Sequence, residues 1–254
     1  MCERAMWIMK RKKNIKLILN IIVYVILLLI LICSSIKIFI WYKDKTNNDK
    51  IIKEIKDKVV VKNDEENEKK DAIDVNKLKD ENSEFVAWIK VNNTNIDYPV
   101  VKTSNNSFYL NHSFDKSVNS AGWIFADYKN KFDGKDKNIV IYGHNMRDGS
   151  MFGSLKNILK EEWYNNSENI KIILTTENEE IIYEVFSVYK IETEDYYIKT
   201  DFSIDSEYQK FLNIIKERSI KNFDVKVKAS DKILTLSTCA NNNKYRVVLH
   251  AKKL

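Results

Sequence analysis

The sequence predicts a mainly β protein, a closed β-barrel with few helices, attached to one N-terminal membrane-spanning helix. After residue 87, short β-rich runs follow one another and two helical patterns interrupt them, which is typical of closed barrels. Residues 17–36 form a stretch of twenty residues without a charge, rich in Ile, Leu and Val. That length matches a helix that crosses a bilayer.

The net charge of +6 arises around this apolar stretch. Residues 1–41 hold seven basic residues and one acidic residue, and subtracting them from the totals of 42 and 36 leaves 35 of each over residues 42–254. The part beyond the apolar stretch is therefore neutral, which argues against a domain that binds nucleic acid or another polyanion.

Five basic residues lie between Lys10 and Lys16, directly before the apolar stretch. Because positive charge marks the cytoplasmic side of a membrane helix, we expect a cytoplasmic tail over 1–16, an anchor over 17–41 and the rest of the chain outside the cell. A cleaved signal peptide is the competing interpretation. The apolar run is long for one, and the segment around Cys33 offers only a poor cleavage site.

Three cysteines occur, at Cys2, Cys33 and Cys239. The chain beyond the anchor therefore carries one thiol and cannot form an internal disulfide. A lone thiol in an exported domain is either buried and inert or a nucleophile. On cysteine count alone, the inert role is favoured.

Residues 42–74 are predicted to form a charged stalk or an amphipathic helix. A short helix capped by Asp74 follows, and another is expected to begin at Ser83. The β-rich runs predict strands over residues 88–91, 96–101, 122–126, 138–143, 170–175, 181–191, 225–228, 233–238 and 246–251.

Two helical patterns interrupt the strands, at 151–160 and at 206–218. The second is the longer and has an apolar stripe along one face. Asp205 is its expected cap. We expect that stripe to pack against the core rather than to line a substrate groove.

The last two strands pair most consistently as an antiparallel hairpin in which Leu236 faces Leu249. This register keeps the apolar side chains on one face and places Cys239 opposite Arg246, whereas a shift by one residue would move the arginine to the wrong face. A thiol and a guanidinium would then lie side by side at a strand end. Such a thiol needs a nearby base, because free Cys has a pKa of about 8.5.

Three histidines are candidates for that base. His144 ends a strand and precedes a glycine-containing turn, where barrels present functional side chains. His112 lies in a polar loop, which favours a solvated side chain, and His250 lies within the last strand, which favours packing. Spacing alone does not decide whether Cys239 and His144 form a nucleophile–base pair.

Two sequence runs resemble those of sortases, which are membrane-anchored transpeptidases of Gram-positive cell surfaces. They are residues 235–239 (TLSTC), followed by Arg246, and residues 142–146 (YGHNM). The runs that resemble class B sortases in particular are 96–101 (IDYPVV), 106–110 (NSFYL), 122–126 (GWIFA) and 148–152 (DGSMF). The resemblance covers residues 75–254, the expected catalytic domain, with 42–74 as the stalk.

The resemblance implies an eight-stranded sortase-type barrel with N-terminal helices and a long helix between strands 6 and 7. No cofactor is expected, and no metal site is indicated, because the histidines are scattered and no paired ligands occur. In the implied catalytic site Cys239 would be the nucleophile and His144 the general acid and base. Arg246 would position the substrate and stabilise the oxyanion.

Six further residues are expected to contact the substrate if the resemblance holds. They are Asn106, Leu110, Tyr142, Tyr197, Ile198 and Ser237. Structural roles remain open for several of them. Asn106 has the side chain of a turn former, Ser237 has a hydroxyl that strand neighbours can satisfy, and Leu110 and Tyr142 are suited to packing.

The implied function is cleavage of a C-terminal sorting signal, LPxTG-like or NPxTx-like, after its Thr. The acyl group would pass through a Cys thioester to an amine of a peptidoglycan precursor or cross-bridge. One alternative is a pilin-polymerising sortase, which the missing aromatic lid segment before the barrel disfavours. Another is an anchored peptide-binding module with a degenerate site. A papain-like peptidase is poorly supported, because in that family the Cys precedes the His.

Overall fold

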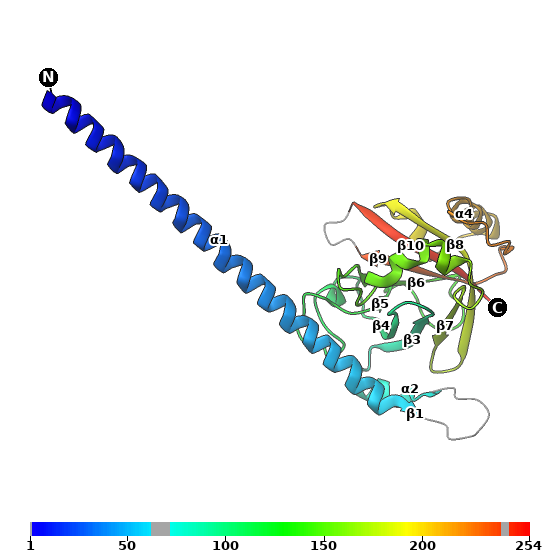
Figure 1. Cartoon of the computed structure of the whole chain (residues 1–254). Helices are drawn as coiled ribbons and strands as arrows, with labels where there is room; N and C mark the ends of the chain where they lie inside the picture. The colour runs from blue at the N-terminus through cyan, green and yellow to red at the C-terminus, as the bar shows by residue number, and fades with distance from the viewer. Residues whose placement is uncertain (1, 62–71, 240–243) are drawn as a thin grey trace. The chain divides into compact units, whose positions relative to one another are not determined.

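The computed structural model describes residues 2–61, 72–239 and 244–254 (Figure 1). The chain divides into two compact units, residues 1–47 and residues 48–254. The first unit lies within helix α1 (Cys2–Val59). Among the described residues, one helix is long and apolar enough to cross a membrane, over Asn14–Val59, and its apolar window is not buried in the protein.

The second unit is built on a closed barrel of eight strands, as expected (Figure 1). The order around the barrel is β10-β8-β7-β3-β4-β5-β6-β9. The strands are β3 (Phe85–Val91), β4 (Asp97–Val101), β5 (Phe125–Ala126), β6 (Asn138–His144), β7 (Lys171–Thr175), β8 (Glu180–Glu192), β9 (Ile233–Cys239) and β10 (Tyr245–Lys253). A separate two-stranded sheet joins β1 (Val60–Val61) to β2 (Ala72–Ile73).

Two of the barrel's strand pairs are parallel, β4 with β5 and β6 with β9, and the others are antiparallel. Strands that run parallel end at the same edge of a sheet. The C-terminal ends of β6 and β9 therefore lie together, and β10 begins at that same edge because it runs antiparallel to β9. This mouth of the barrel collects side chains from three strands.

The expected hairpin register is confirmed where the ladder is described: Leu249 pairs with Leu236, and Val248 pairs with Ser237. Leu234, Leu236 and Leu249 belong to the barrel core, and all three are fully buried. The alternate residues of β9 face outward beneath other elements, which explains why this strand is buried along both faces. Because both faces are buried, a shift by one residue would move every side chain of β9 to the opposite face, where it does not fit, and this fixes the register.

Helix α4 (Asp205–Glu217) lies between β8 and β9 in the chain, which are strands 6 and 7 of the barrel, as predicted (Figure 1). Its apolar stripe packs on the outer face of the sheet. Tyr208, Leu212 and Ile215 form a second core cluster with Phe186 of β8 and Val248 of β10. The stripe is thus core, in agreement with expectation.

The remaining helices are short and lie in the connections. They are α2 (Val75–Glu81), α3 (Glu161–Tyr164) and the 3₁₀ helices η1 (Phe108–Leu110), η2 (Gly153–Leu159) and η3 (Tyr196–Ile198). The predicted cap of the first is confirmed: a carboxylate oxygen of Asp74 accepts a hydrogen bond from the backbone N–H of Lys77 at 3.3 Å. The pattern at 151–160 forms 3₁₀ turns of η2 rather than an α-helix.

Three local expectations are wrong. The helix expected from Ser83 is absent, since β3 already begins at Phe85. Residues 225–228 form no strand, because the carbonyls of Val225 and Val227 accept hydrogen bonds from side chains of α4 instead of from a neighbouring strand. Asp205 does not cap α4 but is its first residue.

A different acidic residue, Glu207, stabilises the first turn of α4. The carboxylate of Glu207 accepts a hydrogen bond from the backbone N–H of Ser203 at 2.8 Å. A carboxylate that reaches back to the residues before a helix satisfies a free donor and interacts favourably with the helix dipole. The pKa of Glu207 is lowered, mainly by its hydrogen bond to Lys199 and then by the one from Ser203.

Candidate active site

The last residues of the two parallel strands are direct neighbours: His144 of β6 pairs with Cys239 of β9. Tyr142 and Ser237 pair two residues earlier in the same ladder. Residues two apart along a strand share a face, so the four positions lie on one side of the sheet. For Cys239 the structure describes the backbone and not the side chain, so the expected contact between its thiol and Arg246 stays a prediction.

The imidazole of His144 is almost fully buried, with 7% exposure. Its Nε2 lies 2.6 Å from the carbonyl oxygen of Leu110 in η1. A carbonyl can only accept, so Nε2 carries the proton and donates. In the neutral ring Nδ1 then has a free lone pair, and this buried atom has no hydrogen-bond partner in the described part of the chain. The ring is thus held from one side and left open to exchange a proton at the other.

Close packing at His144 and at the residue before it requires two glycines. Gly122 has φ +58°, and a Cβ on it would approach the carbonyl oxygen of Tyr109 to 2.5 Å and Cδ2 of His144 to 2.9 Å. A Cβ on Gly143 would approach Cδ1 of Ile124 to 2.5 Å. Both glycines belong to sequence runs singled out above. Gly122 must lack a side chain because its backbone lies against the imidazole, and Gly143 because Ile124 and Phe152 pack against it.

Arg246 lies at the start of β10. Its Nη1 is buried, and within the described residues it has no hydrogen-bond partner. A guanidinium stays charged at every physiological pH and offers five N–H donors in a planar fork. A buried donor without a partner carries a desolvation cost that an incoming acceptor would remove. The arrangement suits a carbonyl oxygen or an oxyanion.

A pocket of about 270 Å³ joins the predicted substrate residues to this arginine. All six of them line it together with Arg246: Asn106, Leu110, Tyr142, Tyr197, Ile198 and Ser237. They come from η1 and the residues before it, β6, η3 and β9. The pocket therefore gathers positions that are up to 140 residues apart in the chain, between Asn106 and Arg246.

The model of the sortase domain family matches residues 89–254. The chain belongs to the sortase family. The sortase is 37% identical to sortase B of Listeria monocytogenes over 174 residues, covering 67% of this chain and 70% of the relative. It is 38% identical to sortase B of Staphylococcus aureus over 176 residues, with the same coverage of both chains.

A solved structure of sortase B from Bacillus anthracis, in complex with AAEK1, superposes on this sortase with a TM-score of 0.72 at 38% identity. The match covers 84% of this chain and 99% of the other. Relatives and structural neighbours agree, so the protein is a class B sortase, a cysteine transpeptidase.

One residue of the site was missed by the sequence reasoning. Asp127 follows the run 122–126 and is buried, with 4% exposure. Its Oδ2 accepts hydrogen bonds from Nδ2 of Asn106 at 2.8 Å and from the hydroxyl of Tyr142 at 2.9 Å. A buried carboxylate with two such donors fixes both side chains at the pocket wall. Its position directly after an apolar run is the sequence signal that could have identified Asp127 as part of the site.

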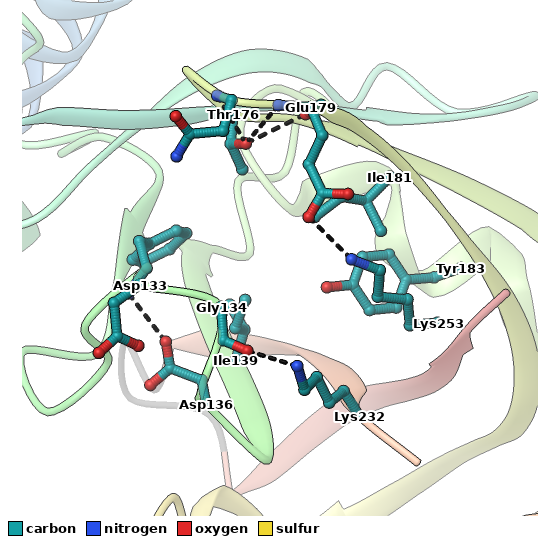
Figure 2. A pocket seen from close by; sticks show the side chains of 12 residues that line it. Asp133, Gly134, Asp136, Ile139, Thr176, Glu179, Ile181, Tyr183, Lys232 and Lys253 are labelled. Carbon is teal, nitrogen blue, oxygen red and sulfur yellow. Dashed lines mark hydrogen bonds and ion pairs between the residues drawn. The ribbon is translucent and has the colours of Figure 1, made fainter.

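A second cavity, of about 200 Å³, lies at the other mouth of the barrel (Figure 2). It is lined by residues at the starts of β6 and β9 and at the end of β10, opposite to His144. Its charged groups already have partners. Lys253 pairs with Glu179 at 2.8 Å, Lys232 donates to the carbonyl of Gly134, and Asp136 accepts from the backbone N–H of Phe132 at 2.8 Å. The pocket at the His144 mouth is therefore the stronger candidate for the active site.

Proposed function

We propose that this sortase cleaves a C-terminal sorting signal after its Thr and transfers the acyl group, through a thioester on Cys239, to an amine of the cell wall. The observation that carries the proposal is the pairing of His144 with Cys239 at the barrel mouth, beside a pocket that Arg246 and the six substrate positions line. Class B sortases are transpeptidases, so the reaction type follows from the family and the roles of single residues are what is proposed.

In the acylation step the thiol of Cys239 gives its proton to Nδ1 of His144, and the resulting thiolate attacks the Thr carbonyl carbon to form a tetrahedral oxyanion. The C–N bond then breaks, and the departing amine takes a proton from Nδ1 of His144. Nδ1 is the ring atom that Leu110 leaves unused. In the second step an amino group attacks the thioester, its proton passes to Nδ1, and the C–S bond breaks to release Cys239 as the thiolate.

Arg246 is proposed to donate to the oxyanion or to a neighbouring substrate carbonyl. Its buried, unpartnered Nη1 supports this role. A donor fixed where negative charge develops stabilises the transition state without reorganisation, and losing one such donor typically reduces kcat by about 10²–10³-fold. The pocket has apolar walls at Leu110 and Ile198 and polar groups at Asn106 and Ser237. That mixture suits an LPxTG-like or NPxTx-like peptide.

The acceptor is proposed to be an amine of a peptidoglycan precursor or cross-bridge, and the enzyme is proposed to work outside the cell from a single-pass anchor. The exposed apolar helix within α1 supports the anchor. The basic residues between Lys10 and Lys16 support a cytoplasmic N-terminus. In this proposal the cytoplasmic tail is residues 1–16, the anchor is 17–41, the stalk is 42–74 and the catalytic domain is 75–254.

The test is turnover of sorting-signal peptides by the full chain in lipid nanodiscs, with a panel of amines as acceptors. We expect a peptide–enzyme adduct on Cys239 by mass spectrometry and amide products only when an amine is present. Cys239→Ala should abolish the adduct, and Cys33→Ala should leave it unchanged. Peptide binding without any adduct would overturn the proposal in favour of a degenerate binding module. Polymers linked through pilin lysines would instead indicate the pilin-polymerising alternative.

A further inference from the structure

Asn48, in helix α1, is the first residue of the barrel unit and is buried, with 4% exposure. Its side-chain amide makes three hydrogen bonds. Nδ2 donates to the carbonyl oxygen of Gly122 at 3.2 Å, and Oδ1 accepts from Nδ2 of Asn119 at 3.0 Å and from the hydroxyl of Ser113. All of these partners are buried. They belong to one loop, residues 111–122, between η1 and β5.

Both ends of this loop contact His144. Before its first residue lies Leu110, whose carbonyl oxygen accepts the Nε2 proton at 2.6 Å. At its last residue lies Gly122, where the backbone comes so close that a Cβ would approach Cδ2 of the imidazole to 2.9 Å. The position of the loop therefore determines where the ring lies and how it is turned.

Other hydrogen bonds also hold the loop, among them one from Nδ2 of Asn82 to the carbonyl oxygen of Phe114 at 2.6 Å. The loop contains no helix or strand element, and its internal backbone bonds include Asn119 N–H to the carbonyl of Asn111 at 2.9 Å and Gly122 N–H to the carbonyl of Asn119 at 3.0 Å. The amide of Asn48 connects Ser113, near the start of the loop, to Gly122 at its end. A buried amide satisfied by three partners holds one orientation, because each alternative leaves polar groups unpaired.

We propose that Asn48 is a positioning residue for His144, so that a residue of α1 helps to orient the general base. The inference rests on the proposed role of His144 in catalysis. Asn48 acts through the backbone of residues 110–122 and does not touch the substrate. An error of about 1 Å in the position of a catalytic group can cost about 10²-fold in rate.

The same helix provides a matched control. Ile55 lies two turns further along α1 and is also buried, with 5% exposure, in the barrel core cluster. It packs without hydrogen-bonding to the loop. Ile55→Ala removes packing from the same helix, whereas Asn48→Leu removes the three hydrogen bonds and keeps a side chain of similar size. Ser113→Ala removes one of the three hydrogen bonds. It is the variant that tests the inference if Asn48→Leu fails to fold.

The experiment uses the full chain in nanodiscs, with kcat, KM and the pH profile of kcat measured on a sorting-signal peptide. We expect Asn48→Leu to lower kcat by about 10–100-fold, to change KM by less than about twofold and to displace a limb of the pH profile. Ser113→Ala should show a smaller change in the same direction. Ile55→Ala should lower the melting temperature while the folded enzyme keeps its kcat and pH profile.

A second measurement is independent of turnover. In protein with ¹³C-labelled histidine, the ring signals of His144, assigned from their loss in His144→Gln, report the environment of Cδ2 directly. We expect these signals to shift in Asn48→Leu and in Ser113→Ala but not in Ile55→Ala. Unchanged His144 signals and an unchanged kcat in Asn48→Leu would overturn the inference. If the wild-type chain showed no transpeptidation but the signals shifted as expected, the proposed function would fail and the positioning contact would stand.

Discussion

The Nε2 atom of His144 donates to the carbonyl oxygen of Leu110 across 2.6 Å, and this contact determines which ring nitrogen can act as the base. Leu110 is also one of the residues that line the pocket. The same backbone segment therefore shapes the proposed substrate site and orients the ring that we propose as general acid and base. Changes in this segment are expected to affect binding and chemistry together.

Replacing His144 by Gln is expected to lower kcat by about 10²–10⁴-fold, the usual contribution of a general acid and base. The Gln amide can still donate to the carbonyl of Leu110, so the fold should be kept, and a thermal melt checks this. Turnover of a sorting-signal peptide measures the loss. Activity above about a tenth of wild type would show that another group moves the proton.

Replacing Arg246 by Lys is expected to lower kcat by about 10–100-fold although the charge is retained. An ammonium lacks the planar fork of donors, and its loss resembles removal of an oxyanion donor. Arg218→Lys is the control for the substitution itself: this arginine, which also lies over the Tyr196 ring, already has a partner, Glu194 at the rim of the same pocket, at 3.0 Å, and a lysine can keep that ion pair. Equal activities of the two variants would argue against a special role of Arg246.

Replacing Asp127 by Asn is expected to raise KM by about tenfold and to leave kcat within about threefold. The variant keeps the size of the side chain but weakens its hold on Asn106 and Tyr142, whose hydrogen bonds to the carboxylate are charge-assisted. Asp133→Asn is the control, since Asp133 is exposed at the other barrel mouth. A large loss in kcat with an unchanged KM would show that the carboxylate serves chemistry instead.

Replacing Gly122 by Ala is expected to impair both stability and catalysis. The residue has φ +58°, and the added Cβ would lie 2.5 Å from the carbonyl oxygen of Tyr109. Gly134→Ala shares the left-handed backbone, at φ +77°, but meets nothing within 4 Å. Strain from φ alone costs about 1–2 kcal/mol, so the control should lose that much and Gly122→Ala clearly more. A chemical denaturation series measures both, and equal losses would contradict the predicted clash.

Stability is expected to fall in acid because of His250. Its Nε2 accepts from the hydroxyl of Tyr189 at 2.8 Å, and its Nδ1 lies 2.8 Å from Oγ1 of Thr235. Burial lowers the pKa of His250 to about 3, from 6.5. Between these values the unfolded chain binds the proton and the folded chain does not. The free energy of unfolding should therefore drop by about 1.4 kcal/mol per pH unit as the pH falls below 6.5.

His250→Gln isolates this contribution, because the carboxylates titrate in both proteins. Urea unfolding of the full chain in detergent at pH 7 and at pH 5 is the measurement. The variant should have a lower free energy of unfolding than the wild type at pH 7, and that free energy should fall less between pH 7 and pH 5. The same pH dependence in both proteins would show that the buried imidazole does not titrate on unfolding.

Elements with a strong periodic pattern were predictable. The register of β9 against β10 follows from the alternation around Leu236 and Leu249, because only one register buries both. Helix α4 follows from its apolar stripe. The run after Ser83 has no such pattern, and there the pairing of β3 with β4 and β7 overrides the local helix signal.

The sequence by itself determined the barrel, the long apolar helix, the family and the residue types of the site, because these depend on periodicity and on short motifs that each lie within a few residues. Only the tertiary structure decided that one carboxylate, Asp127, holds Asn106 and Tyr142 together, and that Asn48 is tied to the loop beside His144. Such contacts join side chains far apart in the chain. Their geometry exists only once the strands have paired and closed, because no local pattern encodes a hydrogen bond between distant residues.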